Sequence, residues 1–450
     1  MVPASAATML KKSGYKVVWM DGIWEDQKYA VWQENLIKQK PDLLALETKT
    51  PVVKLHWKII DKIKKSNPNI KIVLFGDHVT TLPNESMENC LTDYVLTGGD
   101  YDFLLLNLCN YLTKKEKLEP GIWYRSKGKI ANSGEFSLNH DLNSLSPIDR
   151  DLTKWKLYAY KNTNYCRIPG TYTMFGRDCY WGRCSFCSWT TLYPGSKYRQ
   201  ISVKKALDEV GSLIENYNIR EIMDDSGTFP IGDWLREFCN GMIERGYSKK
   251  IRMSCNMRFN SGLTETDYQL MGKAGFRFLL YGLESVNQNT LDKINKNLKV
   301  SQIKPALKWA KKAGLKPHLT VMIGYPWETK KEAKKTLGFA KEIFEEGLAD
   351  TLQATIIIPY PGTPLFKEAK KMGWLKTKDW ERYDMREPIL KTKMTDGEIK
   401  ELVQGFYKSI FNHKWILRKA KEGLTDWDTF KYYWRMTLKL PSKLIDFSTK

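Results

Sequence analysis

The chain has 450 residues, of which 42% are hydrophobic, so it is long enough for two or three domains with ordinary buried cores. It contains no run of about 18 uncharged apolar residues, and we therefore expect no membrane-spanning helix. The first residues, MVPASAATMLKKSGYKVV, lack the pattern of a secretory signal. Eight cysteines in a chain of this length do not predict a disulfide scaffold, and we expect a reducing, cytoplasmic environment.

The formal net charge is +21, from 72 Lys and Arg against 51 Asp and Glu. A basic surface attracts nucleic acid, anionic lipid or acidic small molecules. Many of the lysines fall in helical stretches such as KKALDEV and KKEAKKTL, which is typical of an ordinary solvated surface. We expect no nucleic-acid partner, and we keep an anionic membrane or a phosphorylated substrate as the alternative to a plain solvated surface.

Residues 1–115 alternate short apolar runs with amphipathic stretches of helix length. The pattern predicts strands at 17–20, 43–46, 72–75 and 93–96, and helices at 29–38, 52–65 and 101–112. Strands that alternate with helices predict an α/β domain with a parallel, doubly wound sheet. Ligands bind such sheets outside the carboxyl ends of the strands, which here carry Glu47–Thr50, Gly76–Thr80 and Thr97–Gly99.

Residues 116–165 predict a linker. The sequence GIWYRSKGKI has the pattern of two strands around a turn at Ser126–Gly128. Pro147 interrupts the segment that follows, and we interpret the whole stretch as a connection between two domains.

The stretch CYWGRCSFC places Cys179, Cys184 and Cys187 at a C-x4-C-x2-C spacing. Thiolates are soft ligands that suit zinc, copper(I) or an iron–sulfur cluster. A structural zinc site needs a fourth ligand from a second knuckle, and no such knuckle follows, so we favour the cluster over zinc or free thiols. Cys166 is the alternative fourth thiol, whereas Cys90, Cys109 and Cys239 have the surroundings of small buried hydrophobic residues.

Residues 166–375 contain six predicted strands, and each ends in polar or Gly/Pro residues. The strands are expected at 172–175, 219–223, 251–255, 278–283, 316–323 and 352–358, with helices at 203–217, 234–245, 264–274 and 302–313 and a further helix that ends at Glu345. This order predicts a partial (β/α)6 barrel whose strand ends carry the chemistry, as in complete barrels. Residues 376–450 predict a helical tail that is rich in aromatic residues and carries a net charge of +6 from Lys391 onward.

These motifs resemble the cobalamin-dependent branch of the radical S-adenosylmethionine (SAM) enzymes. The three-cysteine loop is followed in the expected order by MDDSGTF, GLES, IGYPWET and PYPGTP. The first cysteine gap holds four residues where the family commonly has three. The first domain resembles the family's cobalamin-binding domain through GDHVTTLP at Gly76–Pro83 and TGGDYDFLLLNL at Thr97–Leu108. Two departures are the absent D-x-H-x-x-G motif and a missing first strand, because the chain begins at what resembles the family's first helix.

The resemblance implies specific roles for the core. Cys179, Cys184 and Cys187 would hold a [4Fe–4S] cluster, and SAM would chelate its fourth iron. The remaining implied SAM contacts are Phe186 at the adenine, Asp224 or Asp225 at the ammonium, Arg258 at the carboxylate, Glu284 and Ser285 at the ribose or methionine end, and Ile323, Gly324, Tyr325 and Pro326 at the adenine. For Phe186 we keep loop packing as an alternative, for the two aspartates a helix cap, and for Arg258 an ordinary ion pair.

For cobalamin the resemblance implies contacts from Gly76, His78, Thr97 and Gly98. We expect His78 to be a surface or hydrogen-bonding histidine rather than a ligand of cobalt, in line with a family in which cobalamin generally binds without a protein histidine.

The resemblance implies an enzyme that cleaves SAM reductively and transfers a methyl group to an unactivated carbon of an apolar or lipid-like substrate. The alternatives are a radical oxidoreductase or cyclase acting on a tetrapyrrole or isoprenoid, and a non-catalytic cobalamin-binding sensor. We expect an electron donor such as flavodoxin or ferredoxin. The tail, with Trp415, Trp427, Trp434 and the basic residues Lys431, Arg435 and Lys439, is expected either to pack as a cap or to bind the inner face of a membrane with the barrel mouth toward lipid.

Overall fold

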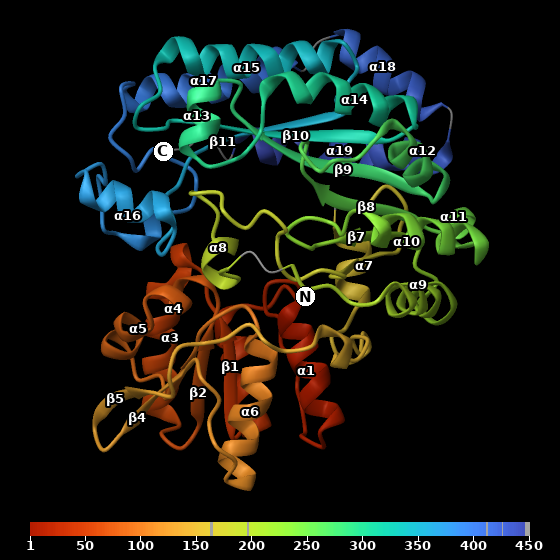
Figure 1. Cartoon of the computed structure of the whole chain (residues 1–450). Coiled ribbons are helices and arrows are strands. Elements are labelled where there is room, and N and C mark those ends of the chain that lie inside the picture. The colour runs from red at the N-terminus through yellow and green to blue at the C-terminus, as the bar shows by residue number, and fades with distance from the viewer. Residues whose placement is uncertain (163–164, 196–197, 411–412, 425, 446–450) are drawn as a thin grey trace. The chain divides into compact units, whose positions relative to one another are not determined.

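A computed structural model describes residues 1–162, 165–195, 198–410, 413–424 and 426–445 (Figure 1). The chain forms two compact units, and each contains segments that are distant in sequence. The first unit consists of Met1–Leu157, Asp178–Arg199 and Pro359–Asp384. The second consists of Tyr158–Arg177, Gln200–Ile358 and Met385–Lys450.

The first unit is built on a five-stranded sheet in the order β1-β2-β3-β4-β5. Its strands are β1 Leu43–Glu47, β2 Lys71–Phe75, β3 Tyr94–Leu96, β4 Ile122–Ser126 and β5 Lys129–Asn132. The first three are parallel, as predicted, and β2 is apolar and buried from Ile72 to Phe75 because helices cover the sheet. These helices are α1 Val2–Lys12, α2 Tyr29–Gln39, α3 Val53–Ser66, α4 Asp77–Thr81, α5 Pro83–Asn89 and α6 Tyr101–Lys114, with the 3-10 turn η1 Thr50–Val52.

Two features of this unit differ from the sequence-based expectation. The predicted hairpin forms, but β4 pairs antiparallel with β3 through Leu96 and Ile122, so it extends the first sheet rather than serving as a linker alone. The strand predicted at 17–20 is absent among the described residues of the first unit, where this stretch has no regular structure. Its apolar run finds no strand to pair with, and Val18 is left 48% exposed.

Two later segments complete the first unit. The cysteine loop, residues 178–199, contains the short helix α8 Trp189–Leu192. The segment 359–384 contains α16 Pro364–Lys371 and the turn η4 Trp380–Arg382, and η4 packs against η1 and α3. The first unit also contains the turn η2 Leu142–Ser144. Its first segment ends at Leu157, within the short helix α7 Lys156–Lys161.

The second unit has six parallel strands in the order β11-β10-β9-β8-β7-β6, which confirms the partial (β/α)6 barrel. The strands are β6 Gly170–Thr173, β7 Glu221–Asp224, β8 Arg252–Met257, β9 Phe276–Glu284, β10 Lys316–Ile323 and β11 Thr351–Ile356. Burial alternates residue by residue along β10, because one side of the strand faces the barrel interior and the other faces its helices.

Amphipathic helices cover these strands, and α14 and α15 lie along β10 in Figure 1. The helices are α9 Val203–Tyr217, α10 Asp233–Glu244, α11 Tyr247–Lys250, α12 Glu265–Lys273, α13 Gln288–Lys293, α14 Ile303–Lys312 and α15 Lys330–Glu345, with the turn η3 Val300–Gln302. Local sequence explains where they begin: Thr329 and Glu332 form a reciprocal capping box at the start of α15, and Thr264 and Asp267 do the same for α12.

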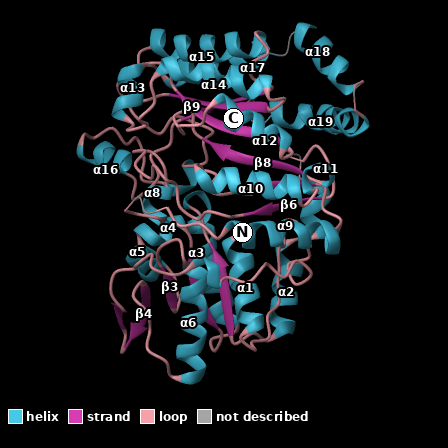
Figure 2. Ribbon diagram, turned by 45° about the vertical axis from the view of Figure 1, so that its right-hand side comes forward, coloured by secondary structure: helices cyan, strands magenta, loops and turns pink. Residues whose placement is uncertain are grey.

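The tail forms three helices, α17 Asp396–Ile410, α18 His413–Gly423 and α19 Trp427–Ile445. Helix α17 packs against α15 (Figure 2). Helix α19 lies at the amino-terminal ends of the barrel strands: Arg220, just before β7, donates two hydrogen bonds to Asp428, and Arg277 near the start of β9 lies over the Tyr432 ring. Because the strands are parallel, this edge is opposite the barrel mouth, so the expectation that the tail turns the mouth toward lipid is wrong.

Trp415 and Lys439, two residues of the predicted tail, have side chains that lie outside the described part of the structure. Within the part of the chain that the structure describes, no helix is long and apolar enough to span a bilayer.

Candidate functional site

The cysteine loop is a chain of tight turns. The N–H of Cys187 donates to the carbonyl of Cys184 at 3.2 Å, and Thr190 donates to the carbonyl of Cys187 through both its N–H and its hydroxyl. Cys184 is buried, whereas Cys179, Cys187 and the predicted adenine contact Phe186 are half-buried. None of the chain's eight cysteines, all of which lie in the described ranges, is in a disulfide.

No three Cys, His, Asp or Glu side chains of the described residues meet in an arrangement that could hold a metal ion. The loop supplies three soft donors within nine residues of sequence, and their assignment to a cluster remains a prediction from sequence and donor chemistry.

A buried ion-pair network ties both ends of the cysteine loop to the first sheet. Arg199 donates to Asp178, just before Cys179, and to Asp100, which follows β3, with Nη2 at 3.0 Å from each carboxylate. Both carboxylate side chains are only 3% exposed. His140 lies 3.0 Å from Asp100 and 3.0 Å from Glu119. Burial opposes the charged ring, but the hydrogen bonds to these carboxylates raise the pKa of His140 to about 9.

The loop also packs directly on the strand-end turn. The N–H of Gly99 donates to the carbonyl of Leu192 at 2.9 Å, and the Tyr193 ring lies so close that a Cβ on Gly99 would be 2.0 Å from it. The cysteine loop also contacts the segment 359–384. The N–H of Leu365, directly after PYPGTP, donates to the carbonyl of Ser185 at 2.8 Å. The first unit therefore holds the cysteine loop against the carboxyl edge of its own sheet.

Three predicted cobalamin contacts lie at this same carboxyl edge. Gly76 approaches β1 so closely that a Cβ would be 2.2 Å from the carbonyl oxygen of Thr48. Thr97 is buried and donates through its hydroxyl to the carbonyl of Gly121 at 2.8 Å. The N–H of Gly98 donates to the Thr80 hydroxyl, and its Cα faces the Phe136 ring. Each of the three positions is thus already packed by the protein on at least one side.

His78, the fourth predicted cobalamin contact, is enclosed. Its Nδ1 lies 3.2 Å from the Thr50 hydroxyl and its Nε2 lies 3.3 Å from Glu85. The rings of Trp57 and Trp380 pack edge-on against it, and the Trp380 indole also donates to Glu85 at 2.9 Å. Both ring nitrogens face protein groups, so His78 joins the segment 359–384 to the first sheet.

In the second unit the predicted SAM residues gather at the carboxyl edge of the barrel. Asp224 ends β7 and is fully buried, which raises its pKa. Its Oδ2 accepts from the Thr173 hydroxyl and from the N–H of Phe175, each at 2.9 Å, and its Oδ1 accepts from Ser226. Both oxygens of Asp224 therefore have protein partners, and Oδ2 joins β6 to β7; the neighbouring Asp225 is half-buried.

Arg258 and Glu284 belong to one buried polar group at the barrel mouth. Glu284 ends β9 with a positive φ of 61° and accepts from the Lys296 ammonium at 2.8 Å. The Arg258 guanidinium donates to the carbonyl of Lys296 and, at 3.2 Å, to the Asn260 side chain. A non-glycine residue in the left-handed region costs free energy, and such strain is concentrated at functional sites.

The remaining predicted residues end β9 and β10. The Ser285 hydroxyl pairs with that of Thr336 at 3.2 Å and accepts from the N–H of Asn287. Ile323 to Pro326 are all buried, with Gly324 at a positive φ of 91°. Glu328 fixes this turn by accepting from the N–H of Gly324 at 2.8 Å, while its Oε1 is buried without a hydrogen bond. Burial raises the pKa of Glu328 to about 7.

Sequence reasoning missed three of these residues. Lys296 lies in a lysine-rich stretch, DKINKNLK, that has the character of a solvated surface, and Arg199 lies in an unpatterned loop. Only Glu328 carried a signal, because it follows Gly324 by four residues within the quoted motif GYPWET.

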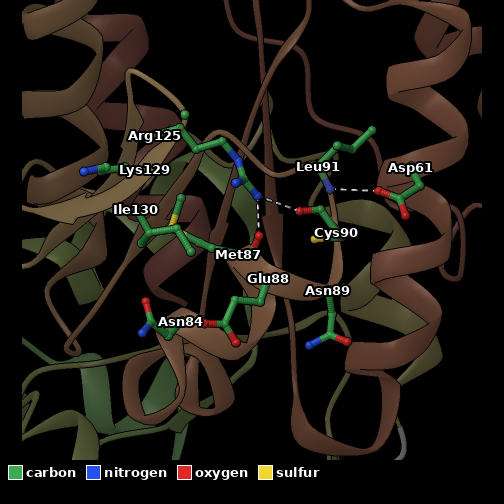
Figure 3. A pocket seen from close by; sticks show the side chains of 11 residues that line it. Asp61, Asn84, Met87, Glu88, Asn89, Cys90, Leu91, Arg125, Lys129 and Ile130 are labelled. Carbon is green, nitrogen blue, oxygen red and sulfur yellow. Dashed lines mark hydrogen bonds between the residues drawn. The ribbon is translucent and has the colours of Figure 1, made fainter.

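A further hollow of about 640 Å³ opens on the first unit (Figure 3). It is lined by α5, the β4–β5 turn and Asp61. Arg125 donates into its floor, to the carbonyls of Met87 and Cys90, and the N–H of Leu91 donates to Asp61 at 2.8 Å. These polar groups already have protein partners, and we assign no ligand to the hollow.

Comparison with known proteins agrees with this architecture. A family model described as the radical SAM superfamily matches residues 174–340. The bacteriochlorophyllide d C-8(2)-methyltransferase of Chlorobaculum tepidum is 30% identical over 379 residues, which cover 78% of this chain and 73% of that one. An uncharacterized methyltransferase of Pyrococcus horikoshii is 27% identical, over 94% of this chain and 92% of that protein.

Two other similarities bear on the function. An anaerobic magnesium-protoporphyrin IX monomethyl ester cyclase of Cereibacter sphaeroides is 26% identical over 90% of this chain and 67% of that protein. The solved structure of OxsB, a cobalamin-dependent SAM radical enzyme with aqua-cobalamin and SAM bound, superposes with a TM-score of 0.71 at 16% identity. The match covers 97% of this chain and 68% of that one, and it shows that the two proteins share a fold.

Proposed function

Because the chain belongs to the radical SAM family in which a cobalamin-binding-type domain precedes the radical SAM core, we propose that it transfers a methyl group to an unactivated carbon in a cobalamin-dependent reaction. The observation that carries this proposal is the position of the cysteine loop. Arg199 and Gly99 hold it on the carboxyl edge of the cobalamin-type sheet, within one compact unit.

The donor set fits a [4Fe–4S] cluster held by Cys179, Cys184 and Cys187, with SAM on the fourth iron. A bound cluster and SAM would supply reductive cleavage of the sulfonium, and cobalamin would supply the methyl group. The chain's own residues would orient SAM: Asp225 would accept from its ammonium, Arg258 and Glu284 would face its methionine or ribose end, and the turn 323–326 would contact its adenine.

The surroundings of His78 fit a cobalamin whose cobalt this histidine does not bind. His78 is enclosed by Trp57 and Trp380, and both its nitrogens face Thr50 or Glu85. Gly76, Thr97 and Gly98 would then contact the cofactor through the strand-end backbone. This assignment is supported by the sheet's fold and by its likeness to the OxsB structure with aqua-cobalamin bound.

We infer an apolar, lipid-like or tetrapyrrole substrate, a flavodoxin- or ferredoxin-type electron donor, and peripheral association with a membrane. The substrate inference is supported by relatives named for bacteriochlorophyllide and magnesium-protoporphyrin IX. The cyclase relative makes oxidation or cyclisation of a tetrapyrrole the second candidate function, and the two candidates differ in their products.

The test begins with anaerobic reconstitution of the full chain. We expect about four irons per chain from the proposed cluster, 5′-deoxyadenosine formation from SAM after reduction, and cobalamin uptake seen by absorbance. Incubation with SAM carrying a labelled methyl group should place the label in the substrate product.

Cys179→Ala, Cys184→Ala and Cys187→Ala should each abolish SAM cleavage. Cys90→Ala, a buried thiol remote in sequence from the loop, should retain it. One tightly held zinc with no iron uptake would refute the cluster. Iron uptake and SAM cleavage without cobalamin binding would refute methyl transfer and leave the cyclase-type chemistry.

A further inference from the structure

A stripe of aromatic and basic side chains lies on one face of α19. Trp427, Phe430 and Trp434 are 65%, 41% and 62% exposed, and Lys431 and Arg435 lie between and beside them. The five positions recur at i, i+3, i+4, i+7 and i+8, so they share one face of the helix. We call this set the aromatic face.

The aromatic face borders a defined groove of about 480 Å³. Its other wall is the segment that carries Cys166 and Ile168. Arg435 donates to the carbonyls of Tyr165 at 3.2 Å and Cys166 at 3.0 Å, which joins the two walls. The Trp427 and Phe430 rings stack with centroids 5.3 Å apart, and the Lys431 ammonium lies 5.1 Å from the Trp427 centroid.

We propose that the aromatic face binds the surface of an anionic lipid bilayer, at the edge of the barrel opposite its mouth. The proposed peripheral association with a membrane would then take place through α19, with the barrel mouth facing away from the bilayer. This proposal rests on that part of the proposed function and not on the proposed chemistry.

The side-chain chemistry favours a bilayer. Tryptophan is enriched at membrane interfaces, where its apolar ring and polar N–H both find partners. Lys431 and Arg435 would meet anionic headgroups. The one acidic residue on this part of α19 is Asp428. Its carboxylate accepts from Arg220 and lies 3.6 Å from Arg167, so it does not neutralise Lys431 or Arg435.

Two other occupants fit less well. A second copy of the chain would bring two basic aromatic faces together, and like charges oppose that pairing. A single-stranded nucleic acid needs open ring faces for stacking, whereas Phe430 and Lys431 already engage the Trp427 ring.

The orientation follows from where α19 docks. Arg220 and Arg277, which contact Asp428 and Tyr432, lie at the amino-terminal ends of β7 and β9. A bilayer bound to the aromatic face therefore lies at the edge of the second unit that is farthest from Asp225, Glu284 and the turn 323–326. A substrate drawn from the membrane would have to leave the bilayer to reach the barrel mouth, which is at the opposite edge.

The test uses the full chain and vesicles of phosphatidylglycerol and phosphatidylcholine in equal parts. At low salt we expect co-sedimentation with these vesicles and not with pure phosphatidylcholine, and we expect it to weaken as salt rises. The triple variant Trp427→Ser, Phe430→Ser, Trp434→Ser should lose binding by more than about tenfold. Lys431→Gln, which leaves the rings in place, should weaken binding about fivefold.

Matched controls are Tyr160→Ser, which removes another aromatic residue that is 50% exposed, and Lys334→Gln on α15. Both should bind like the parent chain. No binding to anionic vesicles at low salt, or binding that the triple variant leaves unchanged, would overturn the proposal. So would dimerisation or RNA binding that depends on the aromatic face in the absence of vesicle binding. SAM cleavage measured without vesicles in the same samples reports separately on the proposed chemistry.

Discussion

The two sheets of this protein differ in what surrounds the carboxyl ends of their parallel strands. In the first unit other parts of the chain pack on this edge: Tyr193 lies against Gly99, Phe136 against Gly98, and the Trp380 ring against His78. In the second unit the edge carries buried charges, with Lys296 on Glu284 and Glu328 fixing the turn at Gly324. The first edge holds the cysteine loop, while the second carries buried ionisable groups among the residues that we propose as SAM contacts. Packing thus fixes a loop at one edge, whereas buried charged groups line the other.

The sharpest test of anchoring is Arg199→Met. The substitution leaves the carboxylates of Asp100 and Asp178 buried without their guanidinium, and breaking such a pair costs about 3–5 kcal/mol. We expect a loss of this size in the free energy of unfolding of the first unit, followed by urea, and a fall in iron retained after reconstitution. Arg245→Met, which removes an exposed pair with Asp208, should cost about 1 kcal/mol or less. Equal losses in the two variants would contradict the anchoring role.

Lys296→Met makes the corresponding change in the second unit. It leaves only one buried carboxylate, that of Glu284, without its cation. The expected loss in the free energy of unfolding is therefore smaller, about 2–3 kcal/mol. SAM binding, measured calorimetrically on the reconstituted protein, should weaken because Glu284 loses the contact that orients it. The double variant Lys296→Met, Glu284→Gln should recover most of the stability, since no charge then remains unpaired, but not SAM affinity. Recovery of both would show that Glu284 does not contact SAM.

Gly99→Ala tests the seat of the cysteine loop with a single methyl group. The added Cβ would be 2.0 Å from the Tyr193 ring, and overpacking of this kind costs about 1–3 kcal/mol. A double-mutant cycle with Tyr193→Leu should show a favourable coupling, because the smaller side chain relieves the clash. Gly338→Ala on α15, where no atom lies within 4 Å of the new Cβ, should instead stabilise the protein by about 0.5–1 kcal/mol.

Glu328→Gln has the smallest effect, and it depends on pH. Burial raises the pKa of folded Glu328 to about 7 from 4.5, so the folded protein holds the proton more tightly than the unfolded chain. This stabilisation is fully present below about pH 4.5 and is lost as the pH rises through about 7. Urea denaturation at pH 4.5 and at pH 8 measures this change. Between the two pH values, the free energy of unfolding of the variant should rise by about 1–2 kcal/mol relative to that of the parent chain. Glu332→Gln should show the opposite sign, because hydrogen bonds from Thr329 lower the pKa of Glu332.

Sequence patterns predicted the barrel well, because most of its strands are apolar runs that an amphipathic helix follows, as α15 follows β10. They also identified the residues at its mouth, where motif and strand end coincide. They could not show that Asp224 is saturated by Thr173, Phe175 and Ser226, since hydrogen bonds between neighbouring strands leave no trace in either strand alone. Lys296 and Arg199 were not predicted either, because the sequence does not distinguish a buried Lys or Arg from an exposed one.

The discontinuous make-up of the first unit has a consequence for biosynthesis. Residues 359–384 supply Trp380 to His78 and Leu365 to the cysteine loop, yet the ribosome makes them only after the whole barrel sheet. Until they emerge, the first sheet lacks one of its covers and the cysteine loop lacks one of its neighbours. Contacts so distant along the chain form late and slowly. In the nascent protein the cysteine loop is therefore held on one side only until residues 359–384 have been made.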